Sequence, residues 1–161
     1  GEEVDALIEA GIIWEVVPGV SSVLAAPAAA GTPLTQRGLA RGFTVRTGHD
    51  TSGPTEGVLD PEEETVVVLM GLKSAPEVLR GLIKEGRSPD TPAIAVARAS
   101  REDEEVVVGT LGTLDREIHA AGLGGPATLI VGEVARRALE RIASLEENPT
   151  AAVIRAVAGI S

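Results

Sequence analysis

The apolar positions of this chain fall into short β-branched runs that alternate with amphipathic stretches. A continuous apolar run such as 65–70, with acids before it and a glycine after it, is typical of a strand buried on both faces. The same pattern predicts six strands, at residues 12–17, 43–47, 65–70, 93–97, 105–110 and 127–131.

Apolar residues at helical spacing predict helices between these strands. In the first of them, residues 2–10, one face carries Val4, Leu7 and Ile8, and Gly11 ends the segment. Further helices are expected at 22–30, from Ser74 to Gly86, from Thr113 to near Gly122, at 136–147, and as a short piece within 150–161. Ser21, Ser74 and Thr113 are predicted to cap the helices that they precede. The alternation predicts an α/β domain with a mixed sheet flanked by helices.

The amino-acid composition excludes several kinds of functional site. The chain has 161 residues, 24 acidic and 14 basic side chains, a net charge of −10, two histidines and no cysteine. Without cysteine, disulfides, thiolate metal sites and cysteine nucleophiles are excluded. An acidic chain is poorly suited to nucleic acid, and no apolar run approaches the roughly 18 residues that a bilayer requires. We expect a cytoplasmic domain that binds no metal, nucleic acid or membrane.

The charges are unevenly distributed. Residues 16–49 contain no Asp or Glu but include Arg37, Arg41, Arg46 and His49. A positive surface on an acidic protein would attract a small polyanion, and the planar guanidinium group binds carboxylates with two hydrogen bonds. The alternatives are a chance distribution of surface arginines and a structural histidine. No Walker, HExxH or GxSxG motif is present, so no conventional catalytic group is assigned.

Six ordered blocks carry a resemblance to a known family. They are VVPGVSSVLAAPAAAGTPLTQRGLA (16–40), TGHD (47–50), VVLMGL (67–72), GRSPDTPAIAVARAS (86–100), GTL (109–111) and PATLIVGEV (126–134). Together they resemble the tetrapyrrole methylases, and the LTQRG and TGH pieces are most similar to its uroporphyrinogen-III C-methyltransferases. The resemblance covers about residues 1–135. It implies the family's second domain, a mixed five-stranded sheet, without the glycine-rich turn and GGDP loop of the first.

This resemblance implies a domain organisation and a reaction. Residues 1–11 would be an interdomain helix, 12–135 the C-terminal methylase domain and 136–161 a helical extension. The reaction would transfer methyl groups from S-adenosylmethionine to uroporphyrinogen III, giving precorrin-2 for sirohaem or cobalamin synthesis in a homodimeric enzyme. We expect this chain to be inactive alone. The alternatives are a non-catalytic dimerisation or tetrapyrrole-binding module and a precorrin methylase with another substrate.

Site residues follow from the matching motif positions. The resemblance implies S-adenosylmethionine contacts from Ser21, Ser22, Met70, Ala99, Ala127 and Thr128. It implies substrate contacts from Glu2, Arg37, His49 and Met70. Gln36 stands where the family usually has histidine, and acid–base residues stay unassigned.

Overall fold

The computed structural model describes residues 1–48, 62–147 and 155–156, with side chains up to Ile142. The strands are β1 (Gly42–Thr47), β2 (Glu64–Leu69), β3 (Pro92–Ala97), β4 (Glu105–Thr110), β5 (Ala127–Val131) and β6 (Arg155–Ala156). The helices are α1 (Glu2–Glu9), α2 (Ser22–Ala29), α3 (Ala75–Lys84), α4 (Leu114–Ala121) and α5 (Arg136–Glu147), with a 3-10 turn, η1 (Glu133–Ala135).

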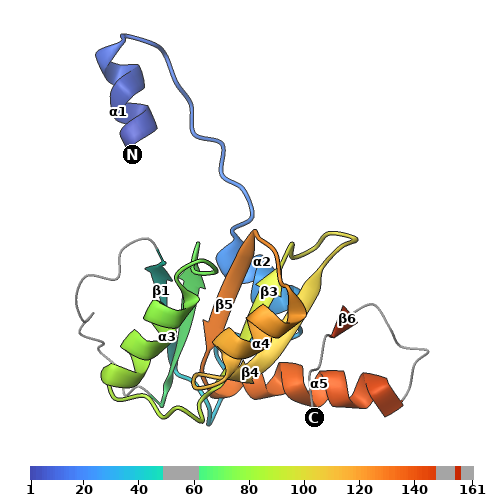
Figure 1. The fold of residues 1–161 in the computed structure, drawn as a ribbon. Helices are drawn as coiled ribbons and strands as arrows, with labels where there is room; N and C mark the ends of the chain where they lie inside the picture. The colour runs from blue at the N-terminus through green and yellow to red at the C-terminus, as the bar shows by residue number, and fades with distance from the viewer. Residues whose placement is uncertain (49–61, 148–154, 157–161) are drawn as a thin grey trace.

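The strands form one mixed sheet in the order β1-β2-β5-β3-β4-β6 (Figure 1). The β1–β2 and β4–β6 pairs are parallel, and the β2–β5, β5–β3 and β3–β4 pairs are antiparallel. The predicted α/β fold with a mixed five-stranded sheet is confirmed, and the two-residue β6 adds a sixth strand at one side.

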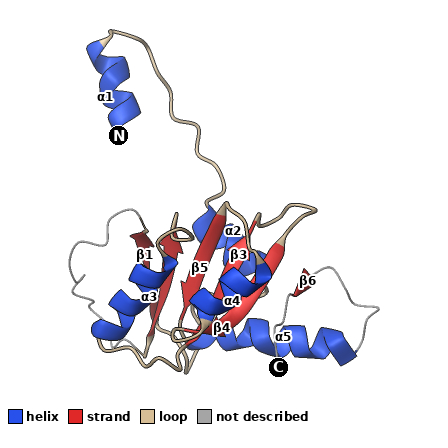
Figure 2. Cartoon of the chain, viewed as in Figure 1, coloured by secondary structure: helices blue, strands red, loops and turns tan. Residues whose placement is uncertain are grey.

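Helices cover both faces of the sheet, with α3 and α4 on one face and α2 on the other (Figure 2). Val66 and Val68 of β2 pack in the cluster with residues of α3 and α4. Val67 packs in the second cluster, with residues of α2 and α5. All three valines are fully buried, which explains why the strand is a continuous apolar run and not an alternating one.

The amino-terminal segment stands apart from this layered body (Figure 1). Helix α1 forms as predicted, but none of its residues is buried. The strand predicted at 12–17 is wrong for this structure, because residues 12–20 pair with no described strand and are all exposed. Ile13 is 98% exposed. The β-branched pattern favours a strand there, but strand pairing requires a neighbour to accept and donate its backbone hydrogen bonds.

At the other end of the chain, α5 is confirmed at Arg136–Glu147. The short helix expected within 150–161 is wrong at Arg155–Ala156, which pair with Glu105 and Val106 of β4. The other residues of that range lie outside the described part.

The predicted helix caps have different outcomes. Ser21 is a cap as predicted, because its hydroxyl accepts a 3.2 Å hydrogen bond from the Val23 amide. Ser74 and Thr113 precede their helices but make no capping bond. The Ser74 hydroxyl instead donates to the Gly48 carbonyl at 2.6 Å, which joins the turn after β2 to the turn after β1.

Two further properties bear on function. Across the described ranges, each helix is too short or too polar to span a bilayer. The same ranges hold no cluster of three or more His, Cys, Asp or Glu side chains that could bind a metal ion.

Candidate functional site at the Met70 edge of the sheet

The strand directions bring several loops to one end of the sheet. Strands β1, β2 and β3 end there, whereas β4 and β5 begin there, as the pairing of Thr47 with Leu69, Leu69 with Thr128 and Ala97 with Ala127 shows. We call this end the Met70 edge. In open α/β sheets, ligands bind in the crevice beyond the carboxyl ends of the strands. The Met70 edge is therefore the candidate site.

Four of the six predicted S-adenosylmethionine contacts lie on strand ends at this edge. Met70 directly follows β2 and is 56% exposed. Ala127 and Thr128 begin β5, and Ala99 follows β3 by two residues. Thr128 is only 5% exposed, so it lies beneath the surface of this edge. Residues 28 to 58 positions apart in the sequence thus lie at the same edge because of the strand order.

The other two predicted contacts begin α2. Ser21 and Ser22 are exposed, and the chain enters α2 at the same edge (Figure 1). Val23 packs against the core cluster to which Leu69 and Ala99 also pack. The first turn of α2 therefore borders the ends of β2 and β3. All six predicted contacts lie at or beside the Met70 edge, although their role in binding stays a prediction.

The backbone is strained at this edge. Met70, Arg98 and Ser100 have φ angles of 56°, 51° and 65°, and in the described ranges they are the only non-glycine residues with positive φ. This left-handed region is unfavourable for residues with a Cβ atom, and such strain concentrates at functional sites. Met70 and Arg98 directly follow β2 and β3, and Ser100 is the third residue after β3.

A close backbone contact holds the Met70 turn in place. The Gly48 amide donates to the Leu69 carbonyl at 2.7 Å. A Cβ atom on Gly48 would lie 2.8 Å from the Met70 carbonyl oxygen and would overlap the Cα atom of Gly71. Only glycine allows the turns after β1 and β2 to pack this closely.

Arg98 is a positioning residue that the sequence analysis did not identify. Its side chain is 16% exposed and forms ion pairs with Asp103 at 2.9 Å and with Glu105 at 2.8 Å. It also donates to the Gly124 carbonyl at 3.1 Å. The guanidinium group thereby ties the end of β3 to the start of β4 and to the loop before β5, on both sides of Ala99. The sequence feature that could have identified Arg98 is an arginine directly after a buried strand and shortly before several acidic residues.

The structure does not bring Arg37 to the Met70 edge. Arg37 is exposed and lies in the turn before β1, whose first residue is at the opposite end of the sheet. Its neighbour Gln36 accepts a 3.2 Å hydrogen bond from Arg137 of α5. The assignment of Arg37 to substrate binding stays a prediction, and this geometry gives it no support.

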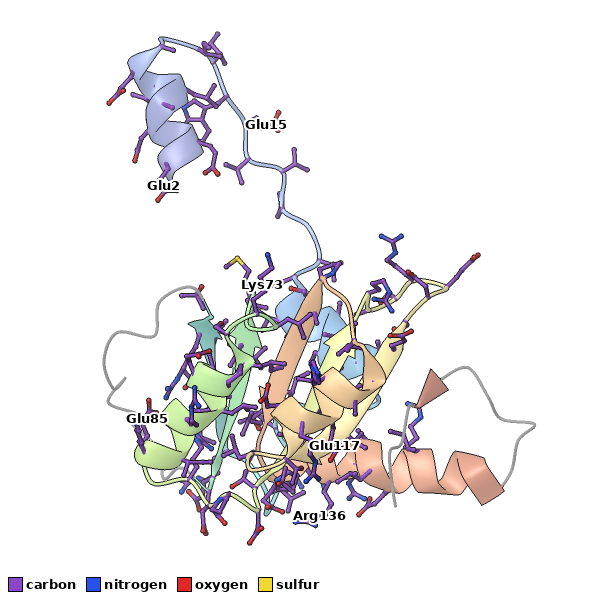
Figure 3. The ribbon with its side chains drawn as sticks, in the orientation of Figure 1. Glu2, Glu15, Lys73, Glu85, Glu117 and Arg136 are labelled. Carbon is purple, nitrogen blue, oxygen red and sulfur yellow. The ribbon has the colours of Figure 1, made fainter. Side chains whose placement is uncertain are left out.

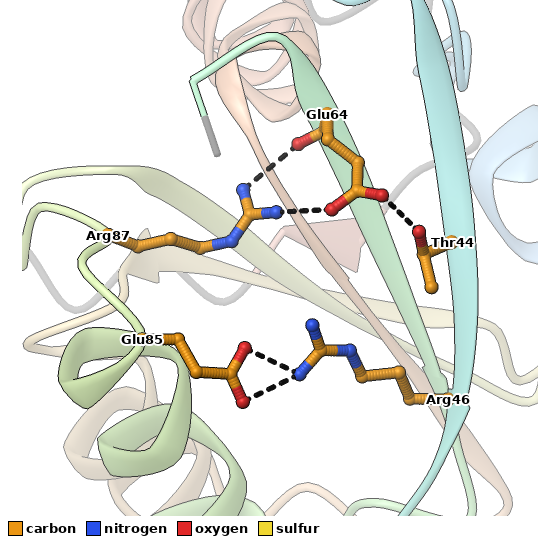
Figure 4. A network of polar contacts seen from close by, with 5 residues as sticks. All are labelled: Thr44, Arg46, Glu64, Glu85 and Arg87. Atoms are coloured by element: carbon orange, nitrogen blue, oxygen red, sulfur yellow. Dashed lines mark hydrogen bonds and ion pairs between the residues drawn. The ribbon is translucent and has the colours of Figure 1, made fainter. Parts of the chain in front are cut away.

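Two other arginines of the acid-poor stretch already have acidic partners. Arg41 pairs with Glu63 at 3.2 Å, and Arg46 pairs with Glu85 at 2.8 Å (Figure 4). The expected positive surface is therefore wrong for both, because folding places acids from later segments beside them. A stretch without acids in the sequence is not a region without acids in space.

The remaining predicted substrate contacts are not joined to the site. Glu2 lies on α1, apart from the sheet (Figure 3). His49 falls outside the described residues.

The chain is similar to known proteins in both sequence and structure. The model of the tetrapyrrole (corrin/porphyrin) methylases matches residues 1–115. A siroheme synthase of Chromobacterium violaceum is 42% identical over 137 residues, which are 83% of this chain and 29% of that protein. An S-adenosyl-L-methionine-dependent uroporphyrinogen III methyltransferase of Methanosarcina barkeri is 38% identical over 139 residues, 83% of this chain and 54% of that protein.

Solved structures are similar as well. A uroporphyrin-III-C-methyltransferase from Thermus thermophilus superposes with a TM-score of 0.72 at 41% identity, covering 86% of this chain and 60% of that one. A Thermus thermophilus uroporphyrin-III C-methyl transferase complexed with S-adenyl homocysteine gives 0.65 at 38% identity, covering 84% and 59%. In these comparisons the chain spans between 29% and 60% of the length of the proteins it matches.

Proposed function

Because this chain belongs to the tetrapyrrole (corrin/porphyrin) methylase family, which consists of S-adenosylmethionine-dependent methyltransferases, we propose that it carries part of the site that methylates uroporphyrinogen III to precorrin-2. The observation that carries the proposal is the convergence of Met70, Ala99 and Ala127 at one edge of the sheet. The similarity to two proteins named for this methyltransferase activity supports the choice of substrate.

The residues at the Met70 edge suit an adenosyl donor. Ala99 and Ala127 are partly exposed and have small side chains, so a ligand can approach the chain closely at these positions. The partly buried Leu69 offers apolar surface beside them. We assign donor contacts to Ser21, Ser22, Met70, Ala99, Ala127 and Thr128. When bound, S-adenosylmethionine supplies a methyl group already activated by a positively charged sulfur.

The protein's own contribution to this reaction is positioning. Holding a donor and an acceptor carbon in line can account for roughly 7–11 kcal/mol of a reaction barrier. The Gly48 contact and the Ser74 hydroxyl fix the Met70 turn, and Arg98 fixes the turn that carries Ala99. Catalysis by positioning does not require a nucleophilic side chain.

The proposal extends to the organisation of the molecule. Residues 1–11 would be the helix between two domains, 12–135 the C-terminal methylase domain and 136–161 an extension, in a homodimeric enzyme. The relatives are longer than this chain, and the apolar side of α1 is exposed, with Ile8 58% exposed. The 161-residue chain alone would then show little or no turnover, because it contains one side of the crevice.

Methyl transfer tests the proposal directly. The product of the complete reading frame is incubated with methyl-labelled S-adenosylmethionine and either uroporphyrinogen III or a later precorrin, beside the 161-residue chain. We expect labelled precorrin-2 from the former and little from the latter. Methylation of a later precorrin alone would identify another methylase of the family. Ligand binding without any transfer would indicate a non-catalytic module.

A substitution connects the activity to the edge. Met70→Ala should weaken both donor and substrate binding, because the exposed side chain belongs to the residue that follows β2, opposite the start of β5. Phe43→Ala is the matched control, since Phe43 is also an exposed apolar residue but lies near the start of β1. Equal effects of the two changes would contradict the assignment.

A further inference from the structure

We propose that Lys73 binds a carboxylate of the ligands at the Met70 edge, an inference that rests on the proposed function. Lys73 lies three residues after Met70, in the turn between β2 and α3. Its side chain is exposed and stands at the end of the sheet where β2 ends (Figure 3). The sequence analysis assigned carboxylate recognition to Arg37, which the structure places at the opposite end.

The turn that carries Lys73 is fixed on both sides. Leu72 packs against the core cluster beneath α3. The Ser74 hydroxyl donates to the Gly48 carbonyl at 2.6 Å, and Ala75 is 1% exposed. The backbone at Lys73 is therefore held in place while its ammonium group extends into solvent. A fixed base under a long side chain reduces the number of positions that the charge can take.

The other cations near this edge are already paired. Arg98 is bound by Asp103 and Glu105, and Arg101 pairs with Asp103 at 3.2 Å. Within residues 1–48 and 62–142, no ion pair is found for Lys73. Of these three cations, Lys73 is the one whose charge no carboxylate of the described chain neutralises.

The charge balance makes this cation significant. The chain carries a net charge of −10, so its general field opposes a polycarboxylate ligand. An ammonium group at the binding edge offsets that repulsion locally. Two carboxylate sources fit: the acetate and propionate groups of uroporphyrinogen, and the α-carboxylate of the methyl donor. The chemistry at Lys73 is the same for both, and binding measurements can distinguish them.

The experiment uses the product of the complete reading frame, with Lys73→Met, Lys73→Arg and Lys84→Met. Lys84 is the matched control, because it is an exposed lysine at the far end of α3. The probes are uroporphyrin III, S-adenosylhomocysteine, and 5′-methylthioadenosine, which lacks the α-carboxylate. We expect Lys73→Met to raise the Kd of one carboxylate ligand about fivefold, the upper range for an exposed ion pair. Lys73→Arg should largely retain affinity, and Lys84→Met should change nothing.

The pattern of affinities decides the outcome. Weaker binding of uroporphyrin alone assigns Lys73 to the substrate. Weaker binding of S-adenosylhomocysteine with unchanged 5′-methylthioadenosine assigns it to the donor. If the unsubstituted protein binds the ligands and Lys73→Met binds all three equally well, the inference is overturned and the proposed function stands. If the unsubstituted protein binds neither uroporphyrin nor S-adenosylhomocysteine, both are overturned.

Discussion

At the scale of single residues, the site depends on positions where a side chain is missing. Gly48 allows the turns after β1 and β2 to touch, because any Cβ atom there would collide with Gly71 and approach the Met70 carbonyl. Gly81 offers the opposite situation, since nothing lies within 4 Å of its missing Cβ atom in the middle of α3. The same substitution should therefore have opposite effects at the two glycines.

Gly48→Ala should lower the free energy of unfolding by about 1–3 kcal/mol, because backbone must move to admit the methyl group. It should also weaken S-adenosylhomocysteine binding in the product of the complete reading frame, since the Met70 turn is displaced. Gly81→Ala should raise the free energy of unfolding by about 0.5–1 kcal/mol through helix propensity. Urea denaturation of both variants checks the two signs, and a neutral Gly48→Ala would contradict the close contact.

At the scale of elements, a polar network fastens α3 to the beginning of β2 (Figure 4). Arg87 follows α3 and donates to the Glu64 carboxylate at 2.8 Å and to its backbone carbonyl at 3.0 Å. Thr44 of β1 also donates to the Glu64 carboxylate. Burial lowers the pKa of the Arg87 guanidinium, and the facing Glu64 carboxylate opposes that shift. The contacts of Glu64 tie three elements together at the end of the sheet opposite the Met70 edge.

Arg87→Leu should lower the free energy of unfolding by about 3–5 kcal/mol, because it leaves the Glu64 carboxylate buried without its counter-charge. Adding Glu64→Gln should restore part of this loss. Arg80→Leu is the control, since its pair with Glu77 is exposed, and its effect should stay within about 0.5 kcal/mol. Chemical denaturation of the four proteins measures these values. Equal losses for Arg87→Leu and Arg80→Leu would contradict a stabilising role for burial.

The elements show how far the sequence alone can predict this molecule. Strands β4 and β5 appear at the predicted residues, because each contains a run of neighbouring apolar residues, and β5 is buried along nearly its whole length. Met70, Ala99 and Ala127, which the motifs assign to the donor, lie at or near the ends of such runs, so their grouping at one edge follows from the strand order. The incorrect predictions concern contacts with segments far away in the sequence. Such segments decide whether residues 12–17 pair with another strand and whether Arg46 forms an ion pair with Glu85.

At the scale of the whole molecule, apolar side chains occur in two different environments. Ile94 of β3 is fully buried in the cluster beneath α2 and α5. Ile13 is 98% exposed, in the extended segment between α1 and α2. The stability of the sheet body in this chain should therefore depend on the first and not on the second, although both are isoleucines in β-branched surroundings.

Ile94→Ala should lower the free energy of unfolding of the 161-residue chain by about 2–5 kcal/mol, as large-to-small changes in a packed core do. Ile13→Ala should change it by no more than about 0.5 kcal/mol. Thermal or urea denaturation of the two variants makes the comparison. A large loss for Ile13→Ala would show that the amino-terminal segment packs against the body.

The exposed segment has a consequence for handling the isolated polypeptide. Residues 12–17, IIWEVV, combine β-branched and aromatic side chains with one charge and no proline. Such hexapeptides stack readily into fibrils when their backbone groups are unpaired. Concentrated solutions of the 161-residue chain should therefore accumulate thioflavin-binding aggregates on storage, and a lysine in place of Val16 should delay their growth while the folded body stays intact.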